Sequence, residues 1–136
     1  MPSGRHRARI LALQTLYEVD TAGHPPEETL ARLLAHTNIK EEVATFAREL
    51  VKGVLENRER IDEVIARAAP AYPVHQLAAI DRNILRLAIQ EILMNNETPV
   101  RAAINEAVEL AKRFGSDSSA RFVNGVLGSV SGMSAG

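Results

Sequence analysis

Arginines are concentrated at the start of the chain, in the segment RHRAR at residues 5–9. The planar guanidinium fork binds phosphate bidentately, so this segment suits contact with a nucleic-acid backbone. On a helix Arg5 and Arg9 share a face, because they are four residues apart, while Arg7 points elsewhere. A basic start that is merely solvated is the alternative, and the segment alone leaves both interpretations open.

A second basic cluster surrounds a predicted bend between two helices near the C-terminus. Lys112 and Arg113 lie in the last turn of the first of these helices, where cations also interact favourably with the helix dipole. Ser116, Ser118 and Ser119 precede or begin the next helix. Its free N–H groups could hold a phosphate, or these hydroxyls could simply cap them.

Three further features of this region have both structural and functional interpretations. Phe114 and Phe122 occupy inner positions of their helices, which is typical of core residues, but a partly exposed ring beside cations could also stack on an unpaired base. Arg121 adds a cation next to Phe122. Gly125 interrupts an apolar stripe, so we expect another helix backbone to approach it closely, with Asn105 and Asn124 in hydrogen bonds between helices.

The sequence contains no recognisable catalytic or metal-binding constellation. It has no cysteine, and its four histidines lack metal-ligand spacing. Neither a Gly-rich phosphate loop nor a GxSxG elbow is present. We therefore expect no catalytic residue, no metal site, no cofactor and no enzyme activity.

Composition favours a helical protein. Hydrophobic residues make up 46% of the 136 residues and aromatic residues 4%, a balance that favours helices over strands. No apolar run is long enough for a membrane span, and no signal sequence follows the basic start, so we expect a cytoplasmic protein. The net charge is −1, yet the charge is polarised, because residues 1–9 hold no acid and many acids lie within residues 27–63.

Apolar spacing predicts an all-α protein of about seven helices and no strand. Asn38 and Glu41 resemble a capping box, Thr98 is predicted to cap a helix that has Pro99 at its first position, and a central buried helix is expected to end at Asn95-Asn96. The expected helices cover residues 4–20, 26–36, 38–57, 61–68, 80–95, 98–114 and 118–130.

Four blocks, in the same order along the chain, resemble the NusB family of bacterial transcription antitermination factors. They are RHRARILALQTLYEVD (5–20), LVKGVLENRERID (50–62), IDRNILRLAIQEI (80–92) and PVRAAINEAVELAKRFGSDSSARFVNGVLG (99–128). The resemblance implies a single NusB-like RNA-binding domain over residues 1–136. It would have an N-terminal bundle at about 4–69, a C-terminal bundle at about 74–130 and a flexible tail at 131–136.

The resemblance also implies a function without catalysis. NusB-like proteins bind boxA RNA together with NusE, a ribosomal small-subunit protein, and help to load an antitermination complex on RNA polymerase during transcription of ribosomal RNA operons. Asp81 would contact NusE. The residues that would contact RNA are Arg5, His6, Arg7, Arg9, Lys112, Phe114, Ser118, Arg121 and Phe122.

Two alternatives remain at this stage. The chain could be a helical interaction module that binds only protein, or a stand-alone relative of the NusB-like domain found in RNA methyltransferases. The sequence contains no strand–Gly-rich-loop–helix unit for a methyltransferase cofactor. Whether the protein forms a homodimer is left open.

Overall fold

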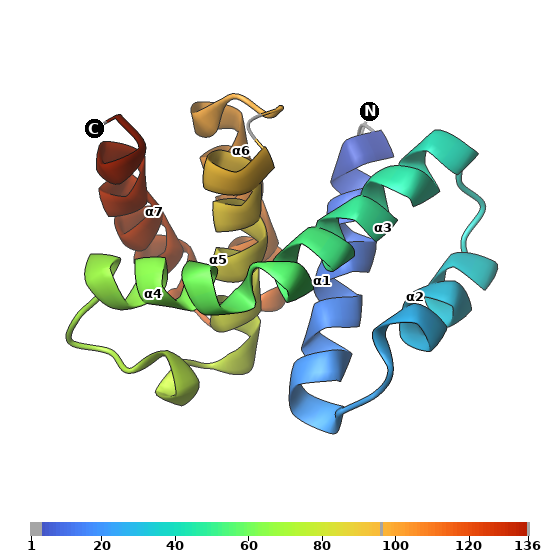
Figure 1. Cartoon of the computed structure of the whole chain (residues 1–136), viewed down its shortest axis with the longest axis horizontal. Helices are drawn as coiled ribbons and strands as arrows, with labels where there is room; N and C mark the ends of the chain where they lie inside the picture. The colour runs from blue at the N-terminus through green and yellow to red at the C-terminus, as the bar shows by residue number, and fades with distance from the viewer. Residues whose placement is uncertain (1–3, 96, 136) are drawn as a thin grey trace.

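The computed structural model describes residues 4–95 and 97–135, which form seven α-helices and no β-strand (Figure 1). The predicted all-α fold is confirmed. The helices are α1 (Gly4–Ala22), α2 (Pro26–Ala35), α3 (Glu41–Glu56), α4 (Arg58–Ala68), α5 (Ala79–Ile89), α6 (Val100–Phe114) and α7 (Ser119–Ala135). A short 3-10 helix, η1 (Val74–Gln76), precedes α5, and a π-helix, η2 (Gln90–Asn95), continues it.

Helix α5 is the centre of the molecule, as its apolar circumference predicts. All of its residues from Asn83 to Ile89 are buried. It packs against α1 on one side and against α4, α6 and α7 on the other. In Figure 1 it stands between α1–α3 at one end of the long axis and α7 at the other, with α6 packed beside it.

The packing of α4 bears on how the chain divides into two bundles. This helix packs mainly against α7 and α5, with fewer contacts to α3. The contacts therefore favour a boundary near Asn57, between α3 and α4, rather than at the predicted position of about residue 69. We propose that α4 belongs with the C-terminal helices.

Several predicted helix ends are wrong by a few residues. Helix α3 begins at Glu41 with Lys40 as its N-cap and no side-chain cap, so the capping box at Asn38 does not form. Helix α6 has Pro99 as its N-cap, and the Thr98 hydroxyl instead donates to Glu91 Oε1 at 2.9 Å. A buried carboxylate competes successfully for this hydroxyl because burial raises the cost of leaving its oxygens unpaired.

The ends of two other helices also differ from the prediction. Helix α7 continues past about residue 130 to Ala135, although its flexibility remains a prediction. The helix that we expected to end at Asn95-Asn96 is π-helical from Gln90 to Asn95, and Asn96 lies outside the described residues.

Candidate nucleic-acid interface

The first turns of α1 expose two of the three N-terminal arginines. Arg5 is exposed, and its guanidinium carbon lies 4.5 Å from the centre of the Phe46 ring. Arg7 is exposed too, with a long contact of 3.5 Å from Nη1 to the carbonyl oxygen of Asn38. Such a contact is weak, so the Arg7 guanidinium keeps most of its donors for a ligand.

A surface hollow of about 370 Å³ brings Arg7 together with Arg113 from the end of α6. Its wall also contains the polar side chains of Gln14 on α1 and Thr37 after α2. Two arginines far apart in the sequence thus border one recess, which we name the basic hollow. The full lining is His6, Arg7, Ile10, Leu11, Gln14, Thr37 and Arg113.

Arg9 lies inside the protein and not on this surface. It is 5% exposed. Its Nε and Nη2 atoms donate to the Glu91 carboxylate at 2.8 and 2.7 Å, and Nη1 donates to Glu106 Oε1 at 2.9 Å. Burial alone would lower the pKa of Arg9, but hydrogen bonds and charge from Glu91 and Glu106 outweigh it and raise the pKa above its usual value. The RNA contact predicted for Arg9 stays a prediction that this burial does not support, because its donors already hold α1 to η2 and α6.

His6 is half-buried beside this ion-pair network. Its Nδ1 atom lies 3.2 Å from Oε1 of Glu106, the carboxylate that Arg9 also contacts. The pair is ionic only when the imidazole is protonated. His6 also lines the basic hollow, so it connects the buried network to the exposed surface.

The bend after α6 has a tightly packed interior and an exposed outer side. The backbone N–H of Ser116 donates to the Ser119 hydroxyl at 2.9 Å, and Ser119 is buried. A Cβ atom at Gly115 would collide with the Ser119 side chain and with the carbonyl oxygen of Ala111. Close packing at the bend thus requires a glycine at position 115.

The prediction of a close approach at Gly125 is wrong. No atom outside its own helix backbone and chain neighbours lies within 4 Å of a Cβ built at that position. Asn105 and Asn124 are both exposed, and among the described residues neither side chain makes the interhelical hydrogen bond that we expected. The surface is simply open there.

The cations of the bend point to solvent. Lys112 is exposed and lies 3.6 Å from Glu109, one turn back on α6. The Arg113 guanidinium carbon lies 5.1 Å from the centre of the half-buried Phe114 ring. Ser118 is exposed. Of the predicted residues here, Lys112 and Ser118 are accessible and Phe114 is partly accessible.

Arg121 and Phe122 line a different recess, of about 360 Å³, between α7 and the linker after α4. The Phe122 ring meets the exposed Tyr72 ring edge to face, with centres 5.4 Å apart. Gly125 lines the same recess. Of the predicted contact residues, His6 and Arg7 line the basic hollow, whereas Arg121 and Phe122 line this recess, and the two hollows share no lining residue.

Asp81 lies in the first turn of α5, where an acid suits the helix dipole. Its Oδ1 atom is buried and has no hydrogen-bond partner among the described residues. The next residue, Arg82, is fully engaged: it pairs with Asp20 at 2.8 Å and donates to the carbonyl oxygens of Val74, His75 and Leu77. The linker before α5 is thus held firmly beside an unsatisfied carboxylate oxygen.

Metal sites and membrane-spanning helices are two other features that the described residues can be checked for. Across residues 4–95 and 97–135, no three His, Asp or Glu side chains are grouped so that they could share a metal ion. None of the helices in that part of the chain combines the length and apolarity needed to cross a membrane.

Arg113 lines the basic hollow and Tyr72 lines the recess beside α7, but neither was predicted as a contact residue. Arg113 had a sufficient structural explanation in the helix dipole, and nothing in its spacing placed it beside Arg7. Tyr72 follows Pro70 and precedes Pro73 in a linker, where an aromatic residue between prolines was the available signal.

The fold and these surfaces define an all-α protein with basic side chains at the rim of a surface hollow. Residues 6–132 match the NusB family, and the chain belongs to this family. It is 53% identical over 131 residues to a protein of Dehalococcoides mccartyi named "Transcription antitermination protein NusB", covering 96% of this chain and 92% of the relative. A protein of Chloroflexus aggregans with the same name is 50% identical, with 96% and 88% covered.

Solved structures agree with this assignment. NusB of T. maritima superimposes with a TM-score of 0.88 at 32% identity, covering 97% of this chain and 93% of that one. A chain in a structure described as antitermination factors NusB and NusE in complex with dsRNA superimposes with a TM-score of 0.89 at 28% identity, with 98% and 99% covered.

Proposed function

We propose that the protein is a transcription antitermination factor that binds boxA RNA together with NusE, and so promotes complete transcription of ribosomal RNA operons. The observation that carries this proposal is the basic hollow, where Arg7 and Arg113 meet in a chain of the NusB family. The curated relatives are named for antitermination and not for a reaction. This role belongs in the cytoplasm, as part of the antitermination complex on RNA polymerase.

The RNA contact would combine phosphate pairing with base stacking. Arg7 and Arg113 are exposed at the border of the basic hollow, and Arg5 is exposed over the Phe46 ring, so each guanidinium group can pair with a phosphate. Lys112 adds a further exposed cation. Phe114, whose ring is half-buried under Arg113, offers an edge to a base.

The second recess would form a separate part of the RNA-binding surface. Arg121 and Phe122 lie there with Tyr72, and Ser118 lies at the start of the same helix. We assign them to a separate RNA segment, because they do not line the basic hollow. His6 lines the basic hollow, so it would belong to the first RNA site. Arg9 is buried and lines neither hollow.

The NusE contact would involve Asp81. Asp81 is half-buried in the first turn of α5. Its Oδ1 atom is buried, so the exposed part of the side chain would make this contact. A contact at this point would also lie on a rigid surface, because Arg82 fixes the linker.

A salt titration tests the RNA contact. Log–log plots of boxA-type RNA affinity against salt should have a slope of about −0.7 for each single-strand phosphate contact. Arg7→Ala should reduce that slope by about one contact, whereas Arg60→Ala, at an exposed position of α4, should leave it unchanged. Adding NusE should raise the affinity strongly for both.

The same experiment separates the alternatives. A slope that Arg7→Ala does not change would favour the module that binds only protein. Affinity that NusE does not raise would overturn the joint binding of RNA and NusE. Sedimentation of the free protein determines whether it forms the homodimer that the sequence left open.

A further inference from the structure

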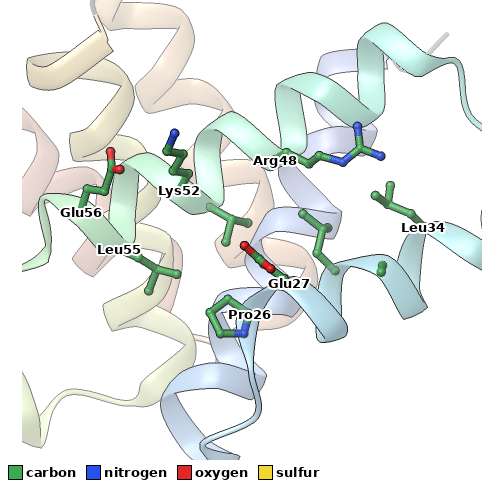
Figure 2. A pocket seen from close by; sticks show the side chains of 10 residues that line it. Pro26, Glu27, Leu34, Arg48, Lys52, Leu55 and Glu56 are labelled. Atoms are coloured by element: carbon green, nitrogen blue, oxygen red, sulfur yellow. The ribbon is translucent and has the colours of Figure 1, made fainter.

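A groove of about 530 Å³ lies between α2 and α3, away from the surfaces assigned to RNA and NusE (Figure 2). It shares no lining residue with either hollow described above. It exists because α2 packs chiefly against α1 and only slightly against α3. Its size is within the range of sites that hold a ligand.

The floor of the groove is apolar. Leu30 and Val51 are buried at its base, while Leu34 and Leu55 remain half-exposed. Leu34 and Leu55 lie at opposite ends of the view in Figure 2, with the open groove between them. An occupant would therefore meet a continuous apolar strip, and covering it would remove that strip from water.

The charges around this floor are polarised. Glu56 stands at one end, near Leu55, and Arg48 stands toward the other end, near Leu34 (Figure 2). Arg48 Nη1 donates to Glu41 Oε1 at 2.9 Å, which leaves its other guanidinium donors for an occupant. On α3 Arg48 and Glu56 are separated by a rise of about 12 Å, the length of roughly two helical turns. Lys52 on α3 and Glu27 on α2 also line the groove.

We propose that this groove is the docking site for a short amphipathic helix of a protein partner, lying antiparallel to α3. The free N–H groups at the partner helix's N-terminus would meet Glu56, and the free carbonyl groups at its C-terminus would meet Arg48. Apolar residues at i, i+3, i+4 and i+7 would cover Leu34 and Leu55. RNA fits poorly, because its phosphates would meet Glu27 and Glu56 as well as the cations.

A designed peptide tests the site directly. The probe is an acetylated and amidated stapled helix of about twelve residues, roughly three turns, with leucine at i, i+3, i+4 and i+7 and uncharged residues elsewhere. Titrated into the ¹⁵N-labelled protein, it should shift amide resonances of α2 and α3 around the groove. A spin label at its N-terminus should broaden amides near Glu56, and one at its C-terminus should broaden amides near Arg48.

Charge reversal tests the orientation. Arg48→Glu and Glu56→Lys should each weaken peptide binding by about two- to five-fold, the effect expected of one charge at a helix end. The double variant should restore the affinity and exchange the two broadening patterns. Arg60→Glu and Glu59→Lys, at exposed positions of α4 outside the groove, are the matched controls and should change nothing.

Several results would overturn the proposal. These are an absence of groove shifts, equal effects of the control variants, or an orientation that does not invert in the double variant. Groove shifts that instead follow the concentration of the free protein would identify a second copy of this chain as the occupant. RNA affinity should be the same in every groove variant, so failure here leaves the proposed function untouched, and the reverse also holds.

Discussion

Arg5 and Arg9 lie on the same face of α1 but differ in exposure and in hydrogen bonding. Both guanidinium groups lie over the Phe46 ring, with the Arg5 carbon 4.5 Å and the Arg9 carbon 5.5 Å from its centre. Arg5 remains exposed, while Arg9 is buried and donates hydrogen bonds to Glu91 and Glu106. One helical turn therefore separates a side chain available to a ligand from one that holds three helical segments together.

The same division extends to other parts of the molecule. Asp20 and Arg82 form a half-buried network at the far end of α1, whereas Arg7 and Arg113 border an open hollow. Charged residues that are buried against protein partners stabilise the arrangement of helices, and exposed ones form the proposed binding surface. The role of an arginine here depends on what lies opposite it in space.

The largest effect is expected where the buried ion pair is broken. Arg9→Met leaves the Glu91 carboxylate, which is 2% exposed, without its cation, and should lower the free energy of unfolding by about 3–5 kcal/mol. Urea denaturation measures the loss.

Arg5→Met is the matched control, and it should cost less than about 1 kcal/mol, because surface substitutions have small effects. The double variant Arg9→Met/Glu91→Leu should recover much of the stability, since the buried Arg9–Glu91 pair is then gone and Glu106, the other partner of Arg9, is partly exposed. Equal losses for Arg5→Met and Arg9→Met would remove the distinction between the two arginines.

Two glycines of the C-terminal hairpin provide the next test. Gly115→Ala should destabilise the protein by about 1–3 kcal/mol, the usual cost of overpacking, because the new methyl group collides with Ser119 and the Ala111 carbonyl. Gly125→Ala should be neutral or stabilise by up to about 1 kcal/mol, since its surroundings are open and alanine favours helix. Thermal unfolding of both variants would show the contrast, and a reversed order would contradict the packing described for the bend.

The helices could be predicted from the sequence because each carries its own apolar periodicity. The stripe from Phe46 to Val54 and the apolar circumference of α5 are local signals, and both helices form where expected. The capping predictions at Asn38 and Thr98 failed because a tertiary partner or a neighbouring residue replaced the local one.

The site was only partly predictable for a related reason. The segment at residues 5–9 marks a basic start, but Arg9 is bonded to Glu91, 82 residues away along the chain, and no spacing rule connects the two. The contact between the hollow's walls is also non-local, so Arg113 could not be placed beside Arg7. Whether an arginine stabilises the fold or can bind a ligand depends on its exposure, and exposure is set only when the chain folds.

The Asp20 network predicts a dependence of stability on pH. Burial would raise the pKa of Asp20, but hydrogen bonds from Asn83 and Arg82 and the charges of Arg82 and Arg86 outweigh it and lower the pKa. A carboxylate with a lowered pKa in the folded state contributes stability above its unfolded pKa, and loses it as the pH falls through the folded value.

The measurement compares wild type with Asp20→Asn in urea between neutral pH and pH values below about 4, the ordinary pKa of aspartate. Their difference in stability should be largest at neutral pH and should shrink below about pH 4. Asp117→Asn, at an exposed position of the bend, should give no comparable difference. A constant gap between wild type and Asp20→Asn would show that the network stabilises by packing and not by charge.

The smallest effect is expected for a single charge added at the exposed surface proposed to bind RNA. Ser118 is exposed beside the proposed RNA surface, so Ser118→Asp adds a negative charge there and should weaken boxA-type RNA binding by about two- to five-fold at low salt, with less effect at high salt. Ser118→Asn controls for side-chain size, and Ser129→Asp, exposed farther along α7, controls for net charge. Equal or tighter binding by Ser118→Asp would place the RNA elsewhere, because a charge on an exposed side chain acts only on what lies within a screening length of it.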